Sequence, residues 1–198
     1  MRTIARHGFA HTTMAHVAAA AGLSQGIVNF YFKSKDGLLY ETLVHLAEEY
    51  EDTLRRALDR AGPDPVAALD AMIDADLGPE VCNPTKVPVW LAFWAESCGQ
   101  PKYRKLCAKL SEEYFRQARD LCVRLADRGG YSNMDIDSIA RGFNAMIDGL
   151  WVDQVIDPKF FDRNQAKLAC RAYLAGYFPA EFGPLADSVR LTTKRRAI

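Results

Sequence analysis

The chain has 198 residues, of which 49% are hydrophobic and 25% charged, and its formal net charge is zero. This composition is typical of a globular protein, and the length allows one large domain or a small domain joined to a larger one. The longest apolar run, Val87 to Ala95, is too short to cross a bilayer, and the first residues lack the apolar core of a signal peptide. We therefore expect a cytoplasmic protein that has no membrane partner.

The charge is distributed unevenly between the two ends of the chain. Residues 1–40 hold four basic side chains and one acidic side chain, a net charge of +3, which leaves −3 for the remainder. A basic N-terminal region on a mildly acidic body suggests that an anionic partner meets the N-terminal region.

Apolar residues recur at spacings of three and four along most of the chain, which is typical of amphipathic helices. The stretch from Tyr103 to Leu125 shows this periodicity, and no run of alternating β-branched residues suggests a strand. The predicted fold class is therefore all-α. We expect about nine helices, at residues 1–8, 13–20, 24–31, 35–61, 64–77, 85–98, 101–128, 135–156 and 162–177.

The sequence AAAAGLS, between the second and third predicted helices, carries the signature of a helix-turn-helix. Alanines allow two short helices to cross closely, Gly22 can adopt the positive φ of the turn, and Ser24 can cap the next helix. Leu23, Val28 and Val17 are expected to fill the small core between the helices.

The remaining side chains of the third predicted helix form a polar and aromatic face that suits DNA. Gln25 and Asn29 are four residues apart, so both amides project from one side, where an amide can pair with adenine. Gly26 allows close approach to the duplex, and Thr13 can cap the second predicted helix and donate to a phosphate. The residues predicted to contact DNA are Thr13, Ser24, Gln25, Gly26, Ile27, Asn29, Phe30, Tyr31, Lys33 and Lys35. The alternative is an ordinary pair of packed helices whose exposed face is merely solvated.

Residues 12–39, TTMAHVAAAAGLSQGIVNFYFKSKDGLL, resemble the DNA-binding region of the TetR family of bacterial transcriptional regulators. The paired threonines, the Ala-Gly turn and the closing YF.SK sequence carry the resemblance. It implies a helix-turn-helix DNA-binding domain in residues 1–40 and a helical ligand-binding and dimerisation domain in residues 41–198. It also implies that the last two helices pair with a second subunit.

The same resemblance makes the first helix look short, because family members usually have a longer one preceded by a basic arm. The expectation is either a shortened first helix or a true N-terminus upstream of Met1. In the first case Ile4 and Phe9 are the only large side chains that anchor this helix against the helix-turn-helix.

Two further segments, VWLAFWAES and IDGLW, are similar to the body of the choline-responsive repressors of betaine synthesis, a BetI-like branch of the family. They place aromatic rings near carboxylates, and ring faces attract a quaternary ammonium ion, which has no hydrogen to donate. The predicted ligand-binding residues are Trp90, Phe93, Trp94, Asp148 and Trp151. The alternative is that these rings pack in the core or in the dimer interface.

No pattern in the sequence indicates an enzyme, so we expect no catalytic residue, metal or cofactor. There is no glycine-rich phosphate loop and no nucleophile elbow. His7 and His11 are four residues apart, but no cysteine or carboxylate completes a metal site. Asp70 and Asp74 look like part of a solvated helix face. The five cysteines show no CxxC spacing and are expected to be free thiols.

These features predict a dimeric regulator that binds a near-palindromic operator through its third helix. A small-molecule inducer, such as choline or another quaternary ammonium ion, is expected to bind the body and release the DNA. An activator with the same DNA-binding domain is a second interpretation. The alternative from another class is an all-α small-molecule-binding protein or enzyme whose shortened N-terminal domain no longer binds DNA.

Overall fold

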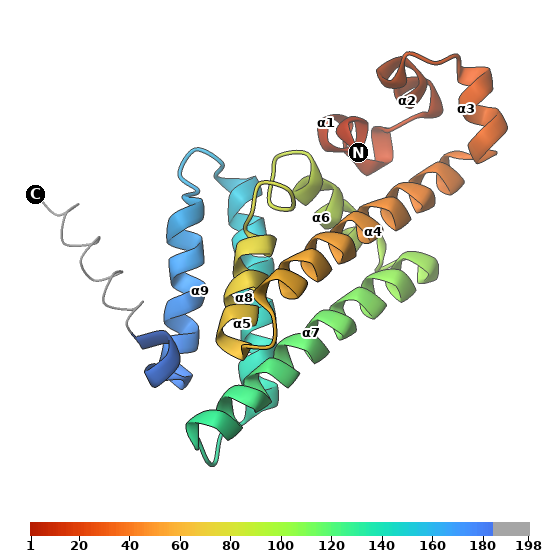
Figure 1. Ribbon diagram of the computed structural model, residues 1–198. Helices are drawn as coiled ribbons and strands as arrows, with labels where there is room; N and C mark the ends of the chain where they lie inside the picture. Colours follow the sequence, from red (N-terminus) through yellow and green to blue (C-terminus); the bar gives the residue numbers. More distant parts are fainter. Residues whose placement is uncertain (184–198) are drawn as a thin grey trace, which may run out of the picture. The chain divides into compact units, whose positions relative to one another are not determined.

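The computed structural model describes residues 1–183, and this part of the chain is helical without a strand (Figure 1). The all-α fold class is confirmed, and every predicted helix lies within three residues of its observed bounds. The helices are α1 (Arg2–His11), α2 (Met14–Ala21), α3 (Gln25–Phe32), α4 (Lys35–Ala61), α5 (Pro65–Asp76), α6 (Lys86–Glu96), α7 (Pro101–Gly129), α8 (Ile136–Ile156) and α9 (Arg163–Tyr177). Residues 179–183 are helical as well.

The turn between α2 and α3 forms as the sequence predicts. Gly22 ends α2 in the left-handed region, at φ 67°, and its N–H donates to backbone carbonyls of α2. The side chains of Thr13 and Ser24 cap α2 and α3, each accepting a hydrogen bond from the backbone N–H three residues on, at 3.1 and 3.3 Å. Local chemistry therefore sets this turn, because each group involved lies within a few residues of its partner.

Helix α1 is interrupted at Gly8, whose φ of 75° and ψ of 168° are not helical. The predicted end at residue 8 reflects this break. Ile4 is buried, as expected of an anchor. Phe9, which the sequence analysis placed against the helix-turn-helix, has its ring contacts elsewhere. It lies edge-on to Phe93 of α6 and Tyr103 of α7, at centroid distances of 5.5 and 5.8 Å.

The helices group into two compact units, each described here by itself. Unit 1 comprises Met1–Asp52 and Asn83–Leu110, and unit 2 comprises Thr53–Cys82 and the chain from Ser111 onward. The long helices α4 and α7 each contribute residues to both units. The predicted domain boundary at residue 40 separates the proposed DNA-binding residues from the proposed ligand-binding and dimerisation residues, which is a different division from that of the two units. It stays a prediction.

Each unit has its own apolar core, built from side chains spaced three or four residues apart on each helix. In unit 1 the buried side chains include Leu38, Leu39, Leu43, Leu46, Ala47, Val87, Val89, Trp90, Phe93 and Tyr103. In unit 2 they include Leu69, Met72, Ile73, Ala118, Cys122, Leu125, Phe143, Ile147, Cys170 and Leu174. Each fully buried leucine or phenylalanine contributes about 2 kcal/mol to stability, so these cores need no metal or disulfide.

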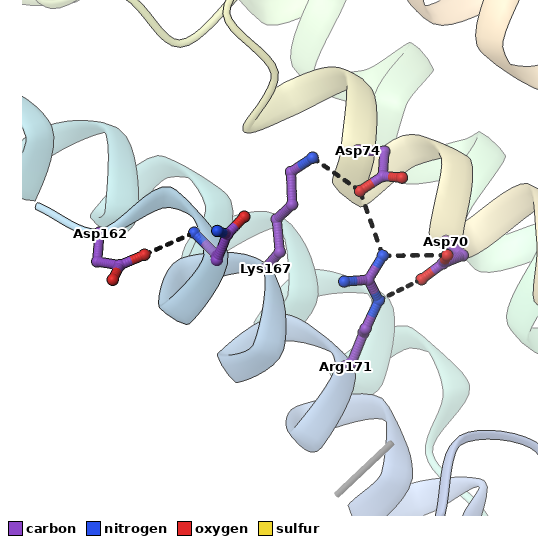
Figure 2. Close-up of polar contacts among 6 residues, drawn as sticks. Asp70, Asp74, Asp162, Lys167 and Arg171 are labelled. Carbon is purple, nitrogen blue, oxygen red and sulfur yellow. Dashed lines mark hydrogen bonds and ion pairs between the residues drawn. The ribbon is translucent and has the colours of Figure 1, made fainter. Parts of the chain in front are cut away.

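Asp70 and Asp74 are partly exposed to solvent, as predicted, and they also bind α9 (Figure 2). Arg171 donates from Nε and Nη2 to the two oxygens of Asp70, at 2.6 and 3.1 Å, and from Nη2 to Asp74 at 3.2 Å. Lys167 pairs with Asp74 at 2.9 Å, and Asp162 caps the start of α9. These ion pairs could not be predicted from the local sequence, because the basic partners lie about a hundred residues further along the chain.

Candidate DNA-binding and ligand-binding sites

Helix α3 turns the predicted DNA face to solvent. Val28 is its buried side chain, and it lies in the small core together with Ala18 of α2. Gln25, Ile27 and Asn29 are exposed. Phe30 and Tyr31 are each 72% exposed and contact one another edge-to-face. Large rings left in water on a short helix are a feature that folding alone does not require.

Leu23 departs from the expectation that it fills the core between α2 and α3, because it is 48% exposed. The N–H of Leu23 donates to the carbonyl of Ala18 at 3.0 Å, while the N–H of Gly22 donates to Ala19 at 3.2 Å. This is the Schellman pattern, which ends α2. Val17, also expected in this core, is half-buried.

Gly26 is not required by the fold. Its φ is not positive, and a Cβ at this position would meet only Ser24 Oγ, at an ordinary 3.8 Å. Glycine within a helix costs about 1 kcal/mol relative to alanine. None of the described contacts therefore requires a glycine at this position.

The two lysines predicted to contact phosphate lie in different settings. Lys33 has a φ of 61°, and the N–H of Ser34 donates across it to Phe32 at 2.6 Å, which forms a tight γ-turn. The Lys33 ammonium is 5.9 Å from the centroid of the Phe30 ring. The Lys35 ammonium donates to the backbone carbonyl of Ala10 at 2.7 Å, so one of its three hydrogens fixes the end of α1.

The histidines of the first two helices stack on one another. His7 lies on His16, with ring centroids 4.8 Å apart and planes 19° apart. Within residues 1–183, no three histidine, cysteine or acidic side chains gather in a way that would hold a metal ion.

In unit 1, the predicted ligand residues lie on α6. Trp90 and Phe93 are buried, whereas Trp94 is half-buried. Trp90 packs edge-on against Tyr50 of α4 at 6.0 Å. Phe93 packs against Phe9, and its side chain is fully enclosed.

In unit 2, the predicted ligand residues lie on α8. Trp151 is buried, and its Nε1 donates to the backbone carbonyl of Asp76 at 3.0 Å. Asp148 is half-buried, and burial raises the pKa of its carboxyl group to about 6. The five predicted residues are thus divided between the two units, and their shared role in holding a ligand stays a prediction.

Unit 2 also contains a buried polar group that was not predicted from the sequence. Asp76 is fully buried and accepts a hydrogen bond from the Tyr114 hydroxyl at 2.6 Å. Tyr114 stacks on Phe143 at 6.3 Å. The sequence did hold a signal for this buried group. Asp76 follows Leu69, Met72 and Ile73 at the spacing of a buried helix face, and a carboxylate on such a face is rarely found without a hydrogen-bonding partner.

The helices of residues 1–183 include none with both the length and the apolar character that crossing a membrane requires.

Comparison with known proteins agrees with these features. Residues 1–42 match the family model of the bacterial regulatory proteins of the tetR family, and residues 65–179 match that of the C-terminal region of BetI-type transcriptional repressors. The HTH-type transcriptional regulator BetI of Ectopseudomonas mendocina is 35% identical over 170 residues, which cover 84% of this chain and 83% of that protein.

Two solved structures share the fold. A TetR transcription regulator from Haloarcula marismortui superposes with a TM-score of 0.76 at 22% identity, covering 89% of this chain and 92% of that one. A protein from Saccharomonospora viridis, solved in complex with choline, gives a TM-score of 0.76 at 22% identity, covering 87% and 90%.

The resemblance stated from the sequence is confirmed, and the regulator is supported over the enzyme alternative. With a helix-turn-helix in α2 and α3 and the two family matches along its length, the chain belongs to the TetR family of bacterial transcriptional regulators, and within it to the BetI type.

Proposed function

We propose that this regulator is a cytoplasmic, homodimeric repressor that binds a near-palindromic operator through α3 and leaves it when a quaternary ammonium ion binds. The observation that carries the proposal is the exposed face of α3, where amides and rings stand in water around a glycine that the fold does not need. Choline is the inducer favoured by the structural neighbour that was solved in complex with choline.

Base reading is assigned to the polar and apolar side chains of this face. Gln25 and Asn29 can pair with adenine edges, and the exposed Ile27 and Phe30 can contact thymine methyl groups. Gly26, next to Gln25 on the same helix, lets the helix backbone come close to the bases. Phosphate contacts are assigned to Thr13, Ser24, Tyr31, Lys33 and Lys35, with Lys35 also fixing the end of α1.

Homodimerisation is assigned to α8 and α9. These helices pack on one another, and their end carries large exposed apolar side chains, Ile156 at 75% and Phe160 at 84%. A groove of about 380 Å³ there is lined by Leu150, Ile156, Phe160, Phe161, Ala166 and Ala169, among others. Such a surface is stabilised when a second copy covers it, and a two-fold dimer matches a two-fold operator.

Inducer binding is assigned, within unit 2, to Asp148 and Trp151 of α8, while Trp90, Phe93 and Trp94 of unit 1 stay predicted ligand residues. A quaternary ammonium ion offers charge without an N–H, so it is recognised by ring faces and by a nearby carboxylate. The raised pKa of Asp148 supports this role. Burial makes the ionised carboxylate less favourable, and a bound cation would offset that loss of free energy.

The proposal is tested by selecting duplexes from a random DNA pool with the purified protein, followed by titration of the bound duplex with choline. We expect a selected sequence with two-fold symmetry, bound in a salt-sensitive way, and release of the protein at millimolar choline. Sodium chloride at equal ionic strength is the control. A pool that yields no preferred sequence would contradict the DNA-binding role, and a complex indifferent to choline would contradict the choice of inducer.

A further inference from the structure

Tyr103, in the first turn of α7, connects three other helices of unit 1. It is 1% exposed. Its ring lies 5.8 Å from Phe9 of α1, 5.4 Å from Phe93 of α6 and 6.4 Å from Tyr40 of α4. One side chain thus joins the helix that precedes the helix-turn-helix, the helix that follows it, and the helix that carries three of the predicted ligand residues.

The polar end of Tyr103 is held at the start of α4. Its hydroxyl donates to Asp36 Oδ1 at 3.1 Å, and the Lys102 ammonium pairs with Oδ2 of the same carboxylate. The Lys102 ammonium also lies 5.0 Å from the Tyr103 ring centroid and 5.6 Å from that of Tyr40. A cation placed between a carboxylate and two ring faces is held more firmly than in an ordinary surface ion pair.

The protonation states suit this arrangement. The hydrogen bond from Lys102 lowers the pKa of Asp36, so its carboxyl group is ionised at neutral pH. Burial, followed by the hydrogen bond to Asp36, raises the pKa of Tyr103, so its hydroxyl remains a donor.

Asp36 lies in the first turn of α4, next to the end of α3, which is called the recognition helix below because it is proposed to read DNA. Helix α3 ends at the γ-turn over Lys33, and Ser34 accepts a hydrogen bond from the N–H of Gly37 at 3.0 Å. A Cβ on Gly37 would lie 2.6 Å from the Phe32 carbonyl oxygen, so the end of α3 and the first turn of α4 touch. A group that fixes Asp36 therefore also restricts the direction of α3.

We infer that Asp36, Lys102 and Tyr103 form a joint, the α4–α7 joint, which positions the recognition helix and so sets operator affinity without contacting DNA. The inference rests on the proposed function, since it takes α3 as the helix that reads DNA.

The test compares variants of the joint on the duplex selected by the wild-type protein. Lys102→Met keeps the aliphatic stem and removes the charge, Tyr103→Phe removes only the hydroxyl, and Lys102→Arg restores a cation. We expect the first two to weaken operator binding by roughly 3- to 30-fold and Lys102→Arg to recover most of the loss. Lys105→Met, an exposed lysine on the same helix, is the matched control and should bind as the wild type does.

The salt dependence separates positioning from contact. Because the joint makes no phosphate contact, the slope of log Kd against log salt should be unchanged in Lys102→Met, whereas loss of a phosphate contact lowers it by about one. A lowered slope, or wild-type affinity in both Lys102→Met and Tyr103→Phe, would overturn the inference. If Lys102→Met fails to fold, Tyr103→Phe decides alone. A wild-type protein that selects no duplex overturns the proposed function itself, which is a different result.

Discussion

Replacement of Gly26 by leucine is expected to weaken operator binding by roughly 100-fold while the protein keeps its fold. The fold has room for the side chain, because a Cβ there meets only Ser24 Oγ at 3.8 Å, and leucine favours a helix more than glycine does. On the DNA side, the new side chain would hold α3 away from the bases that Gln25 and Asn29 are proposed to read.

The measurement is fluorescence anisotropy with the selected duplex, accompanied by thermal unfolding of each variant. Gly99→Leu is the matched control, since Gly99 is also exposed with open space around it, in the turn between α6 and α7. It should bind DNA as the wild type does. A Gly26→Leu protein that melts no lower and binds with wild-type affinity would show that α3 does not approach the duplex.

Replacement of Asp148 by asparagine is expected to stabilise the free protein at neutral pH and to remove its response to choline. The pKa of Asp148 is about 6 in the folded protein against an ordinary value of 3.8. The folded state therefore binds a proton more readily than the unfolded state between about pH 4 and pH 6, and wild-type stability falls as the pH rises through this window. At pH 7 the neutral asparagine avoids a cost of up to about 3 kcal/mol.

Urea unfolding at pH 4 and pH 7 measures this effect, with Asp127→Asn, an exposed carboxylate on α7, as the control. We expect Asp148→Asn to be more stable than the wild type at pH 7 and about equal to it at pH 4. Choline titration of the DNA complex measures the second effect. A stabilised variant that still releases DNA on choline addition would show that the Asp148 carboxylate lies outside the ligand site.

Features set by neighbouring residues could be predicted from the sequence. The turn at Gly22 and the caps by Thr13 and Ser24 each depend on partners within five residues, and all three form as predicted. Helix bounds follow for the same reason, together with the spacing of the apolar residues. The exposed face of α3 could be predicted because the helix-turn-helix pattern assigns Val28 to the small core and leaves Gln25 and Asn29 facing solvent.

Features set by distant residues could not be predicted. The ion pair between Asp70 and Arg171 joins residues about a hundred positions apart, and nothing in the local sequence reveals it. Lys35 was assigned only to DNA, although it also reaches Ala10 across twenty-five positions. The ion pair between Asp36 and Lys102 escaped notice for the same reason.

The account depends most on α3 reading base edges, and the selection experiment repeated with Gln25→Ala tests it directly. If the Gln25 amide pairs with a base, the variant should lose its preference at one position in each half-site, symmetrically, and keep the preference elsewhere. An unchanged preference at every position would contradict the claim that this helix reads the operator.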